Sequence, residues 1–439
     1  MKLPKKPPPW LHLLSTDLLP LLMEHGRTIG PADKYRPWDE VRWRSAPEGM
    51  THEQYWAAIK LARIGMRREL PLTSTSGLLF SYALPDEVLQ GVDWVSRHAS
   101  GQIIAPPATI TDENRDTYIV SSLMAEAITS SQLEGAQTAY AVAKDMLRTG
   151  RKPRTHDELM IVNNYQAMRY IGTIRNEPLT PELICELHRL VTDGTLDNPA
   201  AAGRPQLPGE RRVVVTDAYG EVLHEPPPAE ELPDRLSRLC AFANAQSDSP
   251  YLPPVIRAVI THFMLGYDHP FVDGNGRTAR ALFYWSMLNQ GYWLTEFVSV
   301  SRLLKGAQAR YARSFLHSED DDGDLTYFVI YQLEILQRAI RELHDYIQRK
   351  ANETERLRRA IEGRVGEFNH RQLAVLQHAI RHPKARFTVT SHASSHNVVA
   401  QTSRTDLREL EERGLLARVA QGRGHAWTPV ENLSDLLCQ

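Results

Sequence analysis

Residues 269–280 of this chain read His269-Pro270-Phe271-Val272-Asp273-Gly274-Asn275-Gly276-Arg277-Thr278-Ala279-Arg280. It places a titratable base, a carboxylate, a Gly-Asn-Gly turn and two arginines within a few helical turns. A polyphosphate needs main-chain N–H groups and arginines to hold its charge. A divalent metal that accompanies it needs a carboxylate, and an attacking hydroxyl needs a base such as neutral histidine. The stretch therefore predicts a site for the transfer of a nucleoside phosphate.

Helices are predicted on both sides of this stretch. Residues 254–265 are apolar and follow a Pro-Pro pair, and residues 278–288 are rich in Ala, Leu, Phe and Trp. Residues 269–275 then form the loop between two helices.

The loop and the start of the second helix have the composition of an anion site. Gly274 and Gly276 let the main chain approach an anion closely. Arg277 and Arg280 are three residues apart, so they share one face of the first turn of the helix. Two cations at a helix N-terminus oppose the helix dipole, and a negatively charged ligand there would resolve the conflict.

Position by position, residues 269–280 match the Fic family signature His-Pro-Phe-x-Asp/Glu-Gly-Asn-Gly-Arg-x-x-Arg, so the chain resembles a Fic-type AMP transferase. The resemblance implies that His269 takes the proton from a target hydroxyl and that Asp273 coordinates Mg²⁺. Arg277 would hold the β-phosphate of ATP and Arg280 the γ-phosphate, while a protein Ser, Thr or Tyr hydroxyl attacks the α-phosphorus. The nucleotide-binding residues that it implies are Phe271, Asp273, Gly274, Asn275, Gly276, Arg277 and Arg280.

A second segment, Ser-Ser-Gln-Leu-Glu-Gly ending at Gly135, resembles the inhibitory helix of the same family. Residues from about 117 to 135 are helix-like, and the glycine suits a C-cap. Ser130 and Glu134 share one helix face, and a glutamate near a helix C-terminus favours a cationic partner. The family partner is the second arginine, here Arg280. The resemblance therefore implies an N-terminal inhibitory helix whose Glu134 competes with the γ-phosphate for Arg280.

A third segment resembles the hairpin, or flap, with which the family binds its target. Residues 211–215 and 221–224 are β-prone and flank an Asp/Gly turn. The family adds the target as a strand to this hairpin, so a target protein is expected along Arg211 to His224. The preceding residues 204–209, Arg-Pro-Gln-Leu-Pro-Gly, are longer and richer in proline than the family pattern. Tyr311-Ala312 stands where the family often has a tyrosine pair, and ATP remains the expected nucleotide.

Length and composition indicate the number of domains and the class of protein. A chain of 439 residues suggests two or three domains, and 42% hydrophobic with 24% charged residues is typical of a soluble globular protein. The formal net charge of −2 implies no global attraction to nucleic acid or membrane. Three widely spaced cysteines argue against a disulfide framework and suit a reduced cytosol. We expect a cytoplasmic homodimer with neither a signal peptide nor a transmembrane helix.

The fold class expected from these patterns is mainly α: a Fic-type helical core with a small β-hairpin flap, plus a C-terminal winged-helix domain. Residues 1–112 are expected to form a helical N-terminal region, in which Trp38, Trp43 and Trp56 pack. Residues 113–340 would form the core and 341–367 a helical linker, since apolar residues repeat at helical spacing from 325 to 359. His188, on an apolar helix face, is expected to be structural.

Residues 368–439 resemble a winged helix-turn-helix module. Helices are expected at 371–380 and 401–413, and residues 418–427 are expected to form a β-wing. Nine Lys and Arg against four Asp and Glu make residues 368–430 locally basic. The recognition helix Gln401 to Arg413 would present Thr402, Ser403 and Arg404 to DNA. Instead of binding DNA, this module could serve a protein contact or dimerisation, and the sequence leaves that alternative open.

Two alternatives to AMP transfer remain open from the sequence. The first is a DNA-binding regulator whose Fic-like core senses nucleotide, although a sensor has no need of the base His269. The second is removal of AMP at the same site, with Glu134 orienting a water molecule.

Overall fold

The computed structural model of the chain describes residues 3–100, 112–217, 219–245, 251–362, 367–382, 385–421 and 424–438. The chain divides into two compact units, of which the first ends at Leu343 and the second continues from His344. Helices dominate both units, and the strands of the described residues form three two-stranded antiparallel hairpins. The prediction of a mainly α chain with small β-hairpins is confirmed. No helix in the described ranges is long and apolar enough to cross a membrane.

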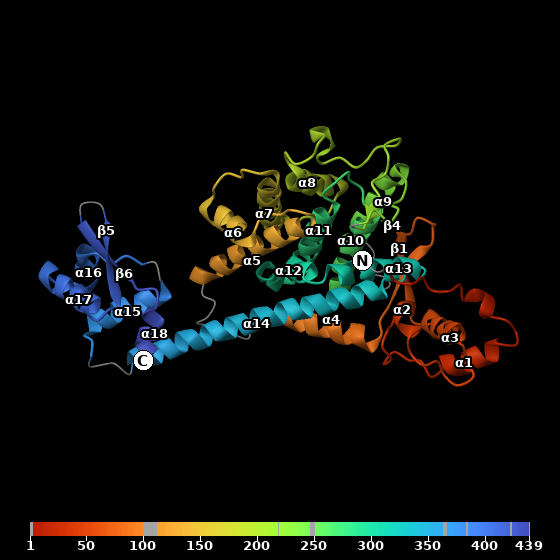
Figure 1. The fold of residues 1–439 in the computed structure, drawn as a ribbon, viewed down its shortest axis with the longest axis horizontal. Coiled ribbons are helices and arrows are strands. Elements are labelled where there is room, and N and C mark those ends of the chain that lie inside the picture. The colour runs from red at the N-terminus through yellow and green to blue at the C-terminus, as the bar shows by residue number, and fades with distance from the viewer. Residues whose placement is uncertain are drawn as a thin grey trace. The chain divides into compact units, whose positions relative to one another are not determined.

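Two consecutive helices, α10 (Pro254–Asp268) and α11 (Asn275–Asn289), form the centre of the first unit (Figure 1). Thirteen of the fifteen residues of α10 are buried, because its sequence is apolar on every face and must be covered on every side. Pro254 opens α10, where its fixed φ suits a first turn. The helices that contact the pair are α5 (Asp112–Leu133), α7 (His156–Ile174), α8 (Pro181–Thr192) and α9 (Leu232–Ala243), and α12 (Val300–Lys305) packs against α5.

The other helices that follow α5 are α6 (Tyr140–Thr149), α13 (Gln308–Asp320) and the 37-residue α14 (Thr326–Glu362), whose residues from His344 onward belong to the second unit. The apolar repeat from 325 to 359 predicts helix, and the structure has one continuous helix there. The short 3-10 helices of the chain are η1 (Leu11–Leu13), η2 (Pro199–Ala201), η3 (Ala229–Glu231) and η4 (Trp293–Phe297).

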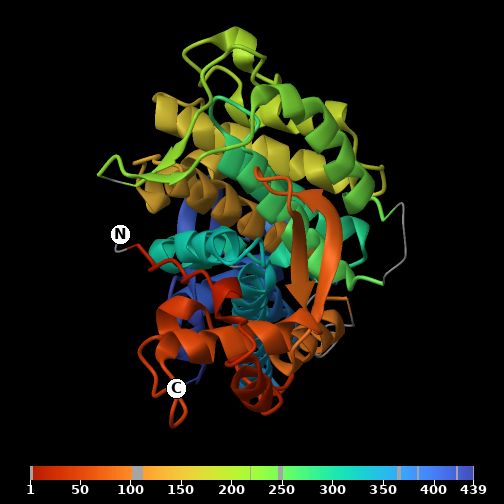
Figure 2. The ribbon, with the colours of Figure 1, turned by 90° about the vertical axis from the view of Figure 1, so that its right-hand side faces the viewer.

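The N-terminal region contains more than the expected helices. Its elements are α1 (Leu19–Gly26), α2 (Trp38–Val41), α3 (His52–Ile64), β1 (Arg67–Thr73), β2 (Leu79–Ala83) and α4 (Asp86–Ala99). Figure 2 shows β1 and β2 as a twisted orange ribbon. The sequence did not predict this hairpin, because β1 contains a proline, which strand interiors seldom hold. Trp38 and Trp56 pack together with ring centroids 5.9 Å apart, but the packing prediction for Trp43 is wrong, since it is 75% exposed.

The acidic run from Glu319 to Asp324 holds the N-terminal region to the helical core. Asp321 accepts a hydrogen bond from the buried Lys60 ammonium at 2.5 Å. Asp324 is completely buried and accepts from Tyr35 Oη at 2.5 Å and from Arg67 Nη2 at 2.9 Å. These ion pairs are shielded from solvent, so each carboxylate is needed to compensate a buried cation.

The second unit follows the order of a helix–helix–helix–hairpin module. Its elements are α15 (His370–Arg381), α16 (Val389–His396), α17 (Ala400–Glu412), β5 (Leu416–Gln421), β6 (Gly424–Pro429) and α18 (Leu433–Cys438). The sequence did not predict α16, whose polar Ser- and His-rich run lacks an apolar period. A capping box between Thr388 and Ser391 starts this helix. Gly422 and Arg423 of the predicted wing lie outside the described residues.

One predicted DNA contact of this unit is wrong. Ser403 is completely buried and donates its hydroxyl to the Val389 carbonyl at 2.8 Å, so it cannot reach a nucleic acid. Gln401 and Arg404, in the same helix, are exposed. Ser403 therefore anchors α17 to α16, and the side chains of Gln401 and Arg404 are exposed to solvent.

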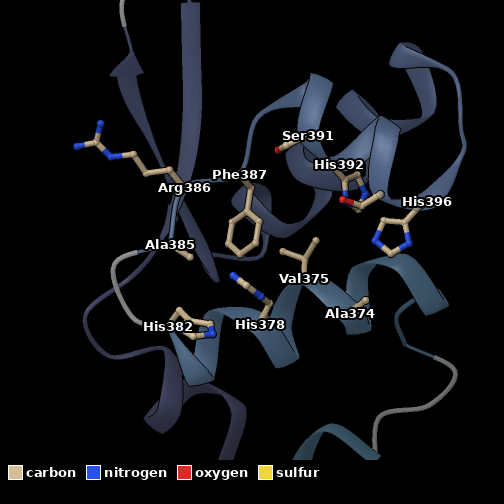
Figure 3. A pocket seen from close by; sticks show the side chains of 11 residues that line it. Ala374, Val375, His378, His382, Ala385, Arg386, Phe387, Ser391, His392 and His396 are labelled. Carbon is tan, nitrogen blue, oxygen red and sulfur yellow. The ribbon is translucent and has the colours of Figure 1, made fainter. Parts of the chain in front are cut away.

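A cavity of about 780 Å³ lies within the second unit (Figure 3). Two histidine pairs at four-residue spacing, His378 with His382 and His392 with His396, line it together with Phe387. His392 is tied to the Asp406 carboxylate at 3.1 Å, so its ring is fixed. No residue of the Gly-Asn-Gly loop contributes to this cavity.

The buried acidic run gives the first testable prediction. Asp324→Asn should lower the free energy of unfolding by about 3–5 kcal/mol, because it removes the charge closest to the Arg67 guanidinium, leaving only Asp321 at 3.6 Å. The matched control is Asp322→Asn, since the Asp322 side chain is 57% exposed and its loss should cost about 1 kcal/mol or less. Urea unfolding monitored by circular dichroism measures both. Equal losses for the two variants would contradict the role of Asp324.

Candidate functional site

The predicted base lies at the point where α10 ends. His269 is the C-cap of α10 and adopts the left-handed conformation, with φ 43° and ψ 52°. A non-glycine residue in this region is strained by about 1–2 kcal/mol, and such strain persists only where surrounding contacts enforce it.

Asn275 fixes the shape of the loop that follows. Its Oδ1 accepts from the Phe271 N–H at 2.9 Å, and its Nδ2 donates to the Phe271 carbonyl at 2.8 Å. The same Nδ2 lies 3.3 Å from His269 Nδ1. One side chain therefore closes the loop on itself and orients the imidazole.

His188 braces the loop from the neighbouring helix α8. Its ring stacks on Phe271 with centroids 3.7 Å apart, and its Nε2 lies 2.8 Å from the Asp273 carbonyl oxygen. Nδ1 accepts from the Gly203 N–H, so Nε2 carries the proton that the carbonyl accepts. Burial lowers the pKa of His188 to about 4. The ring is neutral and fully satisfied, as the sequence predicted for a structural histidine.

Gly274 is required by close packing at the start of α11. It has φ 78°, and a Cβ at this position would lie 2.6 Å from Thr192 Cγ2. Only glycine lets the main chain pass α8 at this distance.

The two arginines of α11 do different things. Arg277 is completely buried and donates to the Val191 carbonyl at 2.7 Å and to Asp273 Oδ2 at 3.2 Å. Its Nε is buried without a hydrogen-bond partner. In this structure Arg277 thus orients the partly exposed Asp273 carboxylate, and a contact with the β-phosphate stays a prediction.

Arg280 is occupied by the helix that the sequence singled out as inhibitory. Its Nε donates to Ser130 Oγ at 2.8 Å, and its Nη2 donates to the Ser130 carbonyl at 3.0 Å and to Glu134 Oε1 at 2.8 Å. Burial, the largest single influence, would lower the pKa of the guanidinium, but the charge and hydrogen bond of Glu134 together with Tyr311 and Glu126 raise it above its usual value. Gly135, with φ 98°, follows the end of α5.

The carboxylate of Glu134 lies directly over the start of α11. A Cβ built on Gly276 would come within 2.1 Å of Glu134 Oε1 and 3.0 Å of Arg280 Nη1. An anion therefore already sits where the dipole of α11 and the charge of Arg280 converge.

A buried glutamate of α5, about two turns before Glu134, anchors α5. Glu126 is 1% exposed, and its carboxylate accepts from Tyr284 Oη and Ser299 Oγ, both at 2.9 Å. It also accepts from the hydroxyl and the N–H of Ser301. The sequence analysis missed Glu126. Its four-residue spacing from Ser130 on the same face was the available signal.

The predicted β-hairpin is present but shorter than its sequence suggested. Only β3 (Val215–Thr216) and β4 (Val222–His224) pair as strands, and Ala218 in the turn lies outside the described residues. His224 joins the hairpin to the core, with Nε2 2.6 Å from the Tyr267 carbonyl and Nδ1 2.7 Å from Glu319 Oε2. Burial, the largest single influence, would lower the pKa of His224, but the hydrogen bond and charge of Glu319, the Tyr267 carbonyl and the charge of Asp268 together raise it.

The environment keeps His269 neutral. Burial, together with the charges of His224 and Arg212, lowers the pKa of its imidazole to about 4, while the charge of Glu134 and a main-chain hydrogen bond with Val213 act in the opposite direction. A neutral imidazole at pH 7 can accept a proton from a hydroxyl. Tyr311, which the family resemblance places near the pocket for the nucleotide base, has its hydroxyl 2.8 Å from His262 Nε2.

One side chain of the loop suits a divalent cation. Asp273 is 56% exposed and has one oxygen on Arg277. Within the described part of the chain, no group of three or more His, Cys, Asp or Glu side chains is arranged to hold a metal ion. Such a single carboxylate suits Mg²⁺, which usually keeps several waters and takes its other ligands from substrate phosphates.

Comparison with known proteins gives one family. Residues 178–287 match the Fic/DOC family profile. The protein adenylyltransferase Fic of Nematostella vectensis is 28% identical over 181 residues, which are 40% of this chain and 39% of that protein. The protein adenylyltransferase fic-1 of Caenorhabditis elegans is 30% identical over 183 residues, 40% of this chain and 33% of that protein. This chain therefore spans two-fifths or less of the length of these relatives.

A solved structure shares the fold. The crystal structure of a Fic family protein from Desulfovibrio desulfuricans G20 superposes with a TM-score of 0.51 at 17% identity, covering 80% of this chain and 98% of that chain. At this identity the likeness concerns the fold alone.

The neutral histidine gives the second testable prediction. In an NMR titration the ring signals of His269 should keep their neutral form until the pH approaches about 4. Because the unfolded chain binds this proton near pH 6.5, folded-state stability should fall as the pH drops from about 6.5 toward 4. Glu134→Gln is the matched variant, since loss of the glutamate charge should move the midpoint lower still. A midpoint near 6.5 would contradict the burial of the ring.

Proposed function

Because the chain contains a Fic domain at residues 178–287, we propose that it transfers AMP from ATP to a Ser, Thr or Tyr hydroxyl of a target protein and of itself. The observation that carries the proposal is the anion at the start of α11. The protein's own Glu134 carboxylate sits against Arg280 and the Gly276 main chain, which is the environment that a polyphosphate needs.

In the proposed reaction the target hydroxyl oxygen forms a bond to the α-phosphorus. The bond between the α-phosphorus and the oxygen that bridges to the β-phosphate breaks, and pyrophosphate leaves with that oxygen. His269 accepts the hydroxyl proton. The neutral state of its ring supports this role.

The other residues hold the nucleotide. The loop residues Phe271, Gly274 and Asn275 shape the phosphate cradle. Arg280, once free of Glu134, holds the γ-phosphate, and Arg277 remains the proposed partner of the β-phosphate. Mg²⁺ bound through Asp273 would neutralise phosphate charge.

The proposed regulation follows from the same contacts. While Arg280 donates to Ser130 and Glu134, its donors are unavailable to the γ-phosphate. ATP then binds with its α-phosphate misplaced for attack. The inhibitory unit consists of Ser130, Glu134 and Gly135.

The target is proposed to bind along the hairpin, Arg211 to His224, by strand addition. The second unit is proposed to be a winged helix-turn-helix, and its exposed Gln401 and Arg404 keep contact with DNA as a prediction. A homodimer, a cytoplasmic location, the reverse reaction with Glu134 orienting water, and a regulator that only senses nucleotide also stay predictions.

The third testable prediction concerns Glu134. Incubation of Glu134→Gly with α-³²P-ATP and Mg²⁺ should raise self-labelling severalfold over the wild-type chain, because Arg280 is released. Glu134→Gln, which keeps a hydrogen-bonding side chain, should give an intermediate signal. The double variant Glu134→Gly/His269→Ala should remove the label. Absence of label in Glu134→Gly, with a cell lysate and with each of the four nucleotides, would reject the transferase.

A further inference from the structure

The strained conformation of His269 raises the question of which contacts hold it. The N–H of His269 is bonded within α10, to the Leu265 carbonyl at 3.0 Å. Its carbonyl oxygen and that of Asp268 point the other way. Both oxygens are bound by a residue from the segment that leads into the hairpin.

That residue is Arg212. Its Nη2 donates to the Asp268 carbonyl at 2.8 Å and to the His269 carbonyl at 3.0 Å. Its Nε donates to the Pro227 carbonyl, beyond the other end of the hairpin, at 2.8 Å. One planar guanidinium therefore joins both ends of the hairpin to the two peptide groups around the base.

Gln206 holds this arginine in place. It lies in the proline-rich segment 204–209, which departs from the family pattern, and it is 4% exposed. Its Oε1 accepts from Arg212 Nη1 and from the Val213 N–H. Its Nε2 donates to the Arg211 carbonyl at 2.8 Å, and its own N–H donates to the Pro270 carbonyl at 2.8 Å.

Both polar groups of the Gln206 side chain are thus used, and three of the four hydrogen bonds of this residue go to main chain. Val213, which donates to Gln206, also bonds through its main chain to the His269 imidazole. The base is therefore contacted on its backbone by Arg212 and on its ring by the next residue.

We propose that Gln206 and Arg212 are positioning residues that form a main-chain clamp between the hairpin and His269. The clamp fixes the left-handed backbone of the base and ties its position to the hairpin on which the target strand docks. The proposal rests on the proposed transferase, in which the hairpin receives the target. It assigns a purpose to the segment that departs from the family pattern.

The clamp requires the shape of these two side chains. A lysine at position 212 has one ammonium group and cannot span the four acceptors that the planar arginine reaches. A methionine at position 206 keeps the volume of glutamine but removes its acceptor and donor. A glutamate at 206 keeps the acceptor for Arg212 and should preserve most of the clamp.

The fourth testable prediction compares these variants in the Glu134→Gly background of the full chain. Arg212→Lys and Gln206→Met should lower the self-labelling rate constant by about 10–100-fold, since a misplaced reacting group costs about that much. The affinity for ATP should change less than about twofold, because neither side chain lies in the phosphate cradle. Gln206→Glu should recover most of the rate.

The matched control is Arg204→Gln. It breaks the ion pair of Arg204 with Glu210 in the same segment without touching the loop main chain. Its rate and ATP affinity should equal those of the parent. A loss as large as that of Gln206→Met would show that any disturbance of the segment suffices, and it would overturn the clamp.

A readout independent of activity separates the clamp from the transferase. The NMR titration midpoint of His269 should rise toward 6.5 in Arg212→Lys and Gln206→Met, because a released loop exposes the ring to solvent. It should stay unchanged in Arg204→Gln. If the parent shows no label but these midpoints shift, the proposed function fails and the clamp stands. Unchanged midpoints in folded Arg212→Lys and Gln206→Met would overturn the clamp.

Discussion

The site depends on one electrostatic constraint. The buried guanidinium of Arg280 and the positive end of the α11 dipole meet at the start of α11, so an anion is needed there. Glu134 provides that anion, 2.8 Å from Arg280 Nη2 and directly over Gly276. An unpaired guanidinium at this depth would cost several kcal/mol, roughly the penalty for an uncompensated buried ion. The ion pair joins the end of α5 to α11, and the buried carboxylate of Glu126 anchors α5 to Ser299 and Ser301.

The loop from His269 to Asn275 is held mainly by contacts to its main chain. Asn275 closes it from within, His188 braces it from α8, and Arg212 binds the two carbonyls at its start. This arrangement leaves the Asp273 carboxylate partly exposed and available to a ligand. It also explains how His269 can remain in a strained conformation while its ring stays neutral and aimed at the site.

The sequence predicted the local part of the site well because the loop residues are neighbours in the chain. The two helices, the loop between them and the structural role of His188 follow from apolar periodicity and glycine positions alone. The pairing of Glu134 with Arg280 spans 146 residues and came from the family resemblance, since periodicity carries no information on which distant charges meet.

Other features lay beyond sequence reasoning because they depend on tertiary contacts. Nothing local distinguishes Gln206 and Arg212 from ordinary loop residues, and their role appears only when their acceptors are seen. The β1–β2 hairpin was hidden by its proline, and α16 by its polar composition. The exposure of Trp43 and the burial of Ser403 show that residue type alone does not decide which side of an element faces the core.

If Glu134 occupies the position of the γ-phosphate, nucleotide binding must distinguish the wild-type chain from Glu134→Gly. Calorimetry with ATP and ADP on both chains measures this. The wild-type chain should bind the two nucleotides with similar affinities, because Arg280 is engaged. In Glu134→Gly, ATP should gain about tenfold or more over ADP, the value of a new charge-assisted contact. An unchanged ratio of ATP to ADP affinity would contradict the claim.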